Sequence, residues 1–129
     1  MTPVFLELDE VLEVHADQIE RYGGSAGVRD LGLLESAIAM PRSGSGEAYF
    51  HSDIHEMAAA YLFHIVKDHP FIDGNKRTGA MAAYVFLRLN GFELSCTDEE
   101  LVDEVIAIAE GRADKVQCAD FFRRHARAE

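Results

Sequence analysis

The sequence predicts an all-α fold of about six helices around a central buried helix. Two observations support this prediction. Apolar residues recur at the three- and four-residue spacing of an amphipathic helix in successive segments of the chain. Most of these segments follow a residue that can cap a helix and end at a glycine or before a proline. Because the 129 residues contain no internal repeat and no linker, we expect one domain spanning residues 1–129.

Two helices are predicted in the first third of the chain. The first covers residues 9–21, where Asp9 is a suitable N-cap and Gly23 a suitable stop. The second follows Asp30, another suitable N-cap, and is expected to end at Pro41 because proline disfavours helical backbone in the residue before it.

A loop and a third helix are predicted next. Residues 42–50 are rich in glycine and serine and have no helical period, which predicts a surface loop with a short extended piece near Tyr49. Ser52 is a suitable N-cap for a helix that ends before Pro70. Because mobile loops beside a site often carry binding residues, this loop is a candidate for docking a substrate.

Three more helical elements complete the prediction. The fourth helix, residues 75–90, is apolar around much of its circumference, so we expect it to be central and buried. A short extended segment over residues 92–96 precedes a fifth helix, for which Thr97 and Glu100 form a capping-box pattern. The sixth helix is expected over residues 115–128, with arginines in its last turns, where cations suit the helix dipole.

The composition limits the classes of partner. Twelve lysines and arginines against 23 aspartates and glutamates give a formal net charge of −11, which repels the nucleic-acid backbone. The sequence has no signal-peptide pattern and no run that approaches a membrane span, so we expect a cytoplasmic protein with neither nucleic-acid nor membrane partners. Cys96 and Cys118 are too few for a disulfide scaffold and are expected to be small packing residues.

The stretch from His69 to Arg77, His-Pro-Phe-Ile-Asp-Gly-Asn-Lys-Arg, concentrates reactive groups between the third and fourth predicted helices. A purely structural interpretation is that Gly74 turns the chain and Asp73 caps a helix. However, Lys76 and Arg77 stand where a helix dipole disfavours cations, at a cost of roughly 0.3 kcal/mol or more each. A bound phosphate removes this conflict, because it accepts from the free backbone N–H groups and pairs with both cations.

The same stretch resembles the signature of the Fic/Doc (Fido) family, His-Pro-Phe-x-Asp/Glu-Gly-Asn-Gly/Lys-Arg-x-x-Arg. Residues 21–24, 27–36 and 86–91 resemble the death-on-curing toxin branch of type II toxin–antitoxin systems. The resemblance implies a small helical Fido fold with the signature loop and its helix at the centre. It also implies the transfer of a phosphate-containing group from ATP, with Mg²⁺, to a protein hydroxyl.

The resemblance further implies roles within the signature. His69 is the implied general base, which takes the proton of the incoming hydroxyl, and Phe71 the implied anchor of the loop in the core. Asp73 is implied to hold Mg²⁺ on the phosphates. The phosphates are implied to bind the backbone of Gly74, the amide of Asn75, and the charges of Lys76 and Arg77.

Departures from the signature bear on which group is transferred. Ala80 replaces the second arginine of the family, as in the death-on-curing toxins, which resemble kinases that bind ATP reversed and transfer its γ-phosphate. Pro70 and Gly74 instead match the adenylylating pattern. We predict phosphorylation of a Ser/Thr hydroxyl that arrests growth, with elongation factor Tu as the substrate implied by the branch. Protein adenylylation (AMPylation) is the alternative.

Two hypotheses come from other classes. His51 and His55 stand four residues apart, so a metal site is a weak alternative; we instead expect His51 at the surface and His64 as a core histidine with a partner. We likewise expect His15 and His125 to be ordinary surface or core histidines rather than metal ligands. The other hypothesis is a non-catalytic interaction module, which has no physical need for a base, a metal ligand and phosphate partners in one loop.

Regulation is predicted to come from another chain. Family members are often restrained by a helix with the pattern Ser/Thr-x-x-x-Glu-Gly/Asn, and the nearest match here, residues 43–48, lacks the last residue and is a poor helix former. The resemblance therefore implies inhibition in trans by a small antitoxin, a segment of which folds onto this domain. Apolar surface around the third or sixth helix could serve, but the sequence does not place the docking surface.

Overall fold

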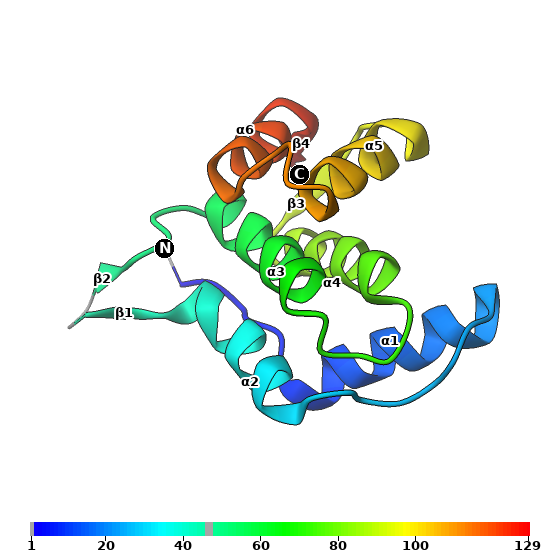
Figure 1. The fold of residues 1–129 in the computed structure, drawn as a ribbon. Helices are drawn as coiled ribbons and strands as arrows, with labels where there is room; N and C mark the ends of the chain where they lie inside the picture. The colour runs from blue at the N-terminus through cyan, green and yellow to red at the C-terminus, as the bar shows by residue number, and fades with distance from the viewer. Residues whose placement is uncertain (1, 46–47) are drawn as a thin grey trace.

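The computed structural model describes residues 2–45 and 48–129, and in this part of the chain six helices pack around a buried core (Figure 1). The helices are α1 (Leu8–Tyr22), α2 (Leu31–Ala39), α3 (Ile54–Asp68), α4 (Asn75–Leu89), α5 (Asp98–Ala109) and α6 (Lys115–His125). A 3₁₀ turn, η1 (Met40–Arg42), extends α2, and two antiparallel pairs join β1 (Gly44–Ser45) to β2 (Ala48–Tyr49) and β3 (Phe92–Leu94) to β4 (Ala126–Ala128). The predicted all-α class is confirmed. None of the described helices is long and apolar enough to cross a membrane.

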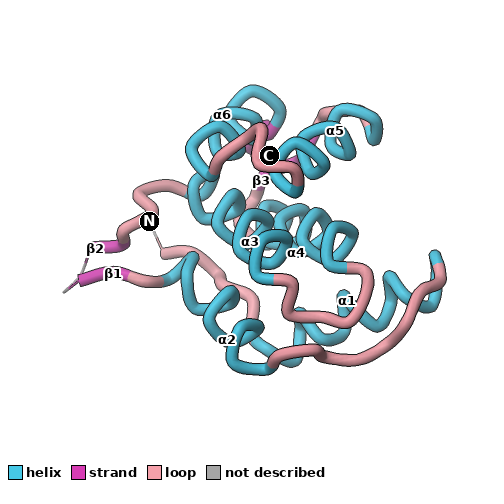
Figure 2. Tube along the Cα trace, viewed as in Figure 1, coloured by secondary structure: helices cyan, strands magenta, loops and turns pink. Residues whose placement is uncertain are grey.

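The centre of the bundle is a pair of helices rather than one. α3 and α4 lie side by side, with α1 and α2 on one side of them and α5 and α6 on the other (Figures 1 and 2). Residues 57–62 of α3 are all fully buried. Gly79 of α4 allows the close approach, because a Cβ atom there would lie 3.2 Å from the backbone oxygen of Leu62. α4 is central, as predicted, and α3 shares that position.

Two predicted N-caps are wrong by one or two residues. α1 begins after Glu7, which is extended at the N-cap, so Asp9 lies in the first turn, where its charge still suits the helix dipole. α3 is capped by Asp53, whose carboxylate accepts from the backbone N–H of Glu56 at 2.8 Å. The hydroxyl of Ser52 instead donates to the side chain of Glu56 at 2.6 Å. Neighbouring residues of equal capping ability explain the error at α3.

The other capping predictions are confirmed, but the end of α6 is not. Asp30 caps α2, and Thr97 begins α5 with a capping box. α6 ends at His125 rather than at residue 128, because residues 126–128 leave the helix to pair with β3. Ser95 donates to the carbonyl oxygen of His125 through both its backbone N–H (2.8 Å) and its hydroxyl (2.6 Å). A helical period in sequence gives no sign of such a distant strand partner.

The predicted loop over residues 42–50 carries the β1–β2 pair, which confirms the extended piece near Tyr49. The stretch 43–48, the nearest match to an inhibitory helix, includes residues 46–47, which lie outside the described residues. Its described residues belong to the strands rather than to a helix, apart from Ser43 at the end of η1.

Candidate active site

The signature loop, residues 69–74, joins the two central helices at the side of the bundle where α1 and α2 lie (Figure 2). An isolated antiparallel bridge pairs Val28 with Phe71, and the backbone N–H of Ile72 donates to the carbonyl oxygen of Gly27 at 3.1 Å. These backbone bonds fix the middle of the loop against a segment more than forty residues earlier in the chain.

His69 begins the loop as the C-terminal cap of α3, in the left-handed backbone region at φ 53° and ψ 51°. It is the only non-glycine residue with positive φ in the described parts of the chain. Such conformations are sparsely populated and persist where surrounding contacts hold them, often at functional sites. The side chain of His69 is exposed and lines a pocket of about 160 Å³.

Arg29 holds this unusual turn from outside the signature. Its guanidinium donates to the carbonyl oxygens of His69 at 2.6 Å and Asp68 at 2.9 Å, and its backbone N–H donates to the carbonyl oxygen of Pro70 at 2.7 Å. Carbonyl groups at the end of a helix have no partner within it, so Arg29 satisfies the end of α3. Arg29 was not among the predicted site residues, although it lies in one of the stretches that resemble the toxin branch.

His15 of α1 supports the loop from the opposite side. Its ring stacks on that of Phe71, with the centroids 3.8 Å apart and the planes 5° from parallel, and both side chains are buried. Its Nε2 atom lies 2.8 Å from the carbonyl oxygen of Asp73. His15 is thus a buried histidine whose hydrogen-bond partner belongs to the signature loop.

Asp73 presents an exposed carboxylate that is held by two backbone donors. Oδ2 accepts from the N–H of Ser25 at 3.1 Å, and Oδ1 accepts from the N–H of Gly74 at 2.8 Å. These bonds, that from Ser25 first, lower the pKa of Asp73 below its ordinary value. The carboxyl is therefore ionised at neutral pH.

A lone carboxylate of this kind fits Mg²⁺, which commonly binds one or two carboxylates together with substrate phosphates and water. The described residues contain no group of three His, Cys, Asp or Glu side chains that could hold a metal ion by themselves. Asp73 would therefore share such an ion with phosphate oxygens, because each carboxylate oxygen accepts one bond and can accept more. Asp73 lines the same pocket as His69.

Asn75, the first residue of α4, is 4% exposed and bonded to the loop on both sides of its amide. Its Oδ1 accepts from the backbone N–H of Phe71 at 2.9 Å, and its Nδ2 donates to the backbone oxygen of Phe71 at 3.0 Å. Nδ2 also lies 3.1 Å from Nδ1 of His69. The amide therefore connects the start of α4 to the implied base.

The two cations of the signature have different surroundings. Lys76 is exposed and lines the pocket. Arg77 donates to the backbone oxygens of Gly23 at 2.8 Å and Gln18 at 3.4 Å, and its Cζ atom lies 5.9 Å from the ring centroid of Tyr22. Arg77 thus holds the end of α1 to the start of α4 and is also one of the residues that line the pocket.

The structure brings all the implied phosphate-site residues to one place. The pocket is lined by His69, Ile72, Asp73, Gly74, Asn75, Lys76 and Arg77. It opens at the N-terminus of α4, where backbone N–H groups have no partner within the helix. Phe71 is fully buried beneath it. An anion with several oxygens matches this combination of donors and cations.

A larger pocket of about 590 Å³ adjoins the first, because Arg77 lines both. Its walls come from α1, α4 and α5 and include Tyr22, Ala80, Tyr84 and Val102. A third, apolar pocket of about 250 Å³ shares Ala80 and Val102 with it. Apolar surface near the signature therefore lies between α4 and α5.

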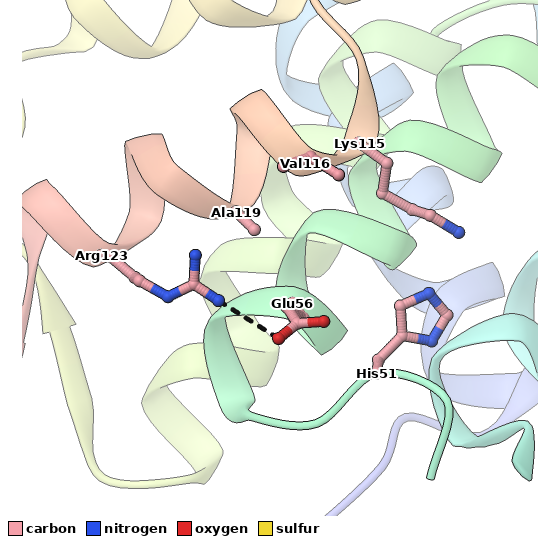
Figure 3. A pocket seen from close by; sticks show the side chains of 6 residues that line it. All are labelled: His51, Glu56, Lys115, Val116, Ala119 and Arg123. Carbon is pink, nitrogen blue, oxygen red and sulfur yellow. Dashed lines mark hydrogen bonds and ion pairs between the residues drawn. The ribbon is translucent and has the colours of Figure 1, made fainter.

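A separate pocket of about 220 Å³ lies between the start of α3 and α6 (Figure 3). His51, expected at the surface, lines this pocket but is only 7% exposed, and burial followed by the nearby Lys115 charge lowers its pKa. Glu56 forms an ion pair with Arg123 at 3.2 Å, as Figure 3 shows, instead of turning to His51. The ring of His55 packs edge-on against Phe92. The two histidines therefore have separate surroundings. The prediction that His51 lies at the surface is wrong, because the segment before α3 packs it against α6.

The comparisons with known proteins agree with this arrangement. The Fic/DOC family model matches residues 5–87, which extend from just before α1 to near the end of α4. Protein kinase doc from Escherichia phage P1 is 36% identical over 117 residues, which cover 90% of this chain and 90% of that protein. Toxin Doc from Mycolicibacterium smegmatis is 37% identical over 89 residues, which cover 65% of this chain and 68% of that protein. The chain therefore belongs to the Fic/Doc family, in its death-on-curing group.

Proposed function

We propose that this protein is an ATP-dependent phosphotransferase that modifies a Ser or Thr hydroxyl of another protein. The observation that carries the proposal is the convergence of His69, Asp73 and Lys76 on one pocket at the N-terminus of α4. A candidate base, a candidate metal ligand and a phosphate-binding helix end are the parts that phosphoryl transfer needs. The relative from phage P1, which spans nearly the same length, is named a protein kinase.

In the proposed reaction, the substrate hydroxyl attacks the γ-phosphorus of ATP and the bond from that phosphorus to the β-bridging oxygen breaks, which releases ADP. His69 takes the hydroxyl proton. Asp73 would hold Mg²⁺, which neutralises charge on the phosphates. The backbone at Gly74, the amide of Asn75 and the side chain of Lys76 would bind phosphate oxygens. Arg77 would add its charge without leaving the end of α1.

The surroundings of Ala80 support γ-phosphoryl transfer over adenylyl transfer. Ala80 lines the larger pocket, which shares Arg77 with the phosphate pocket. Its volume of about 590 Å³ is within the range of small-molecule sites, roughly 300–1,000 Å³. An arginine at this position would extend into that space. We propose that the nucleoside lies here, which places the far end of ATP, the γ-phosphate, beside His69.

Adenylyl transfer is the second candidate, because Pro70 and Gly74 match the adenylylating signature. It would use the same base and the same phosphate-binding residues, with ATP bound in the other direction. A non-catalytic binding module is a third candidate and is the least compatible with a pocket that collects a base, a carboxylate and cations.

The proposed partners follow from the toxin group. One relative is named a toxin, and we propose that this chain also arrests growth by modifying a translation protein, with elongation factor Tu as the first substrate to test. Such a substrate places the reaction in the cytoplasm. We also propose a small antitoxin that inhibits the enzyme in trans.

The purified protein, incubated with elongation factor Tu, Mg²⁺ and ATP labelled at either the α or the γ position, tests this proposal. Label from the γ position on the substrate is expected, and label from the α position would favour adenylylation. His69→Ala should abolish transfer, whereas His125→Ala, outside the pocket, should not. Transfer of neither label, or equal transfer by His69→Ala, would contradict the enzymatic proposal.

A further inference from the structure

The buried amide of Asn75 has only one acceptable orientation. Its Oδ1 faces the backbone N–H of Phe71 at 2.9 Å, and its Nδ2 faces the backbone oxygen of Phe71 at 3.0 Å. Exchanging the oxygen and nitrogen would place donor against donor and acceptor against acceptor. At 4% exposure, water cannot compensate for either mismatch. The contacts of one residue therefore identify which amide atom is nitrogen.

This orientation determines where neutral His69 carries its hydrogen. The amide Nδ2 has two hydrogens, one for the backbone oxygen of Phe71 and one for Nδ1 of His69, which lies 3.1 Å away. Since an amide nitrogen only donates, Nδ1 must be the acceptor. A neutral imidazole has one N–H, so its hydrogen lies on Nε2. Protonation of Nδ1 would set two donors against each other.

The tautomer matters because a general base must offer a free lone pair. The lone pair of Nδ1 is directed to Asn75, on the buried side of the pocket floor. Nε2, on the other edge of an exposed ring, is the nitrogen that an incoming hydroxyl can reach, and in this tautomer it already carries a hydrogen. His69 cannot take a proton on Nε2 while Asn75 donates to Nδ1.

Asn75 is also one of the residues that line the pocket, beside Lys76. An anionic oxygen bound there competes for the amide hydrogen now shared with His69. Hydrogen bonds to a charged acceptor are roughly twice as strong as neutral ones, so the anion has the advantage over the imidazole. Once the amide hydrogen turns to the anion, Nδ1 no longer faces a donor.

We propose that Asn75 is a positioning residue that holds His69 in its Nε2–H tautomer and releases it when phosphate binds. On release, Nδ1 gains a proton from water and Nε2 loses one to water, so the net charge of the imidazole is unchanged. Nε2 then has the lone pair that a base needs. The base is thereby withheld until the nucleotide is in place. The release step rests on the proposed function, whereas the tautomer follows from the hydrogen bonds alone.

NMR of protein labelled with ¹⁵N at histidine distinguishes the tautomers, through two-bond correlations between ring protons and ring nitrogens. Spectra are recorded at rising pH until the ring signals of His69 stop changing, so that the imidazole is neutral. The signals of His69 are identified by their loss in His69→Gln. The wild-type protein is expected to show His69 with its hydrogen on Nε2. A hydrogen on Nδ1, or an even mixture, would overturn the proposal without any variant having to fold.

Two variants test the control by Asn75. Asn75→Asp should reverse the tautomer, because a carboxylate only accepts and so selects hydrogen on Nδ1. Asn75→Ala should give the mixture of an unconstrained imidazole. A residue that merely fixed the loop would leave the tautomer of His69 unchanged in a folded variant, and that result would refute the role proposed for Asn75. If the aspartate variant fails to fold, the alanine variant and the wild-type spectrum decide.

Adding ADP with Mg²⁺ to the wild-type protein tests the release step, and the backbone amide signal of Gly74 reports binding. Binding with transfer of the His69 hydrogen to Nδ1 is expected. Binding with the hydrogen still on Nε2 would overturn the release step alone. If Gly74 and the other pocket amides do not respond even at millimolar ADP, both the release step and the proposed nucleotide site fail. The tautomer assignment would then stand or fall on the first spectrum.

Discussion

Gly24 lies so close to Asp73 that a Cβ atom added to it would sit 2.6 Å from Oδ2 of the carboxylate. Its φ of +113° is also a backbone region that residues with a side chain rarely adopt. The next residue, Ser25, supplies one of the two N–H groups that bond this carboxylate. The turn after α1 is therefore shaped around the candidate metal ligand, although it lies almost fifty residues away in sequence.

Gly24→Ala should displace the carboxylate of Asp73 and weaken Mg²⁺ binding. Loss of a contact that orients a metal ligand typically costs about 10- to 100-fold in metal affinity or activity. Titration of the transfer rate with Mg²⁺ measures the change. Gly111→Ala is the matched control, because Gly111 also has positive φ but a Cβ atom there meets nothing within 4 Å. Gly24→Ala and Gly111→Ala should each lose roughly 1 kcal/mol of stability, because alanine is disfavoured at positive φ. If the two variants need the same Mg²⁺ concentration, Gly24 does not position the Asp73 carboxylate for the metal.

Arg29→Ala should leave the last carbonyls of α3 without a donor and loosen the turn at His69. We expect kcat to fall by roughly 10- to 100-fold, because small displacements of a catalytic group have effects of that size. The free energy of unfolding should fall by only about 1 kcal/mol, since the bonds are exposed. Arg21→Ala, which removes an exposed ion pair with Asp17, is the control and should change neither quantity appreciably. An unchanged kcat in Arg29→Ala would exclude a positioning role.

Ala80→Arg should obstruct the larger pocket and raise the KM for ATP by at least about tenfold. The substitution is compatible with folding because Ala80 is half-buried beside a pocket. Leu89→Arg, at a position 45% exposed near the end of the same helix, serves as the control. If the KM of Ala80→Arg equals that of wild type, the nucleoside does not lie beside residue 80. A gain of label from the α position would indicate that this residue selects the direction of ATP.

Stability should decrease on mild acidification because of His64. Burial, and then the charge of Lys115, lower the pKa of His64 from 6.5 to about 4. Between these pH values the unfolded chain binds more protons than the folded one, so the free energy of unfolding falls as the pH drops from 6.5 toward 4. The contribution of neutral His64 to stability is fully present above pH 6.5. Urea unfolding at several pH values measures the slope. His64→Gln should make the slope shallower without removing it, because burial also lowers the pKa of His51 and of His55. An equal slope in this variant would contradict the contribution assigned to His64.

The sequence predicted best what depends on neighbouring residues. The caps of α2 and α5 are local patterns, and the signature from His69 to Arg77 is contiguous, so both are recognisable in the sequence alone. The central position of α4 followed from its apolar residues, whereas the equal share of α3 in the centre was not predicted. What the sequence placed wrongly at α3 was a choice between adjacent capping residues, for which the free-energy difference is small.

The supporting contacts of the site could not be predicted because they join distant parts of the chain. His15, Gly24, Ser25 and Arg29 come from the first quarter of the sequence, and each contacts residues of the signature loop or the end of α3. The sequence around these residues has no pattern that predicts which distant residue each one contacts. The burial of His51 and the pairing of β4 with β3 were missed for the same reason.

The most direct test of the central claim is the intact mass of elongation factor Tu after incubation with the enzyme, Mg²⁺ and ATP, with fragmentation to identify the modified residue. The account predicts a gain of one phosphoryl group on a Ser or Thr hydroxyl, absent with His69→Ala. A gain of an adenylyl group would contradict the proposed direction of ATP. An unchanged mass, with ATP intact, would contradict the proposed activity toward this substrate.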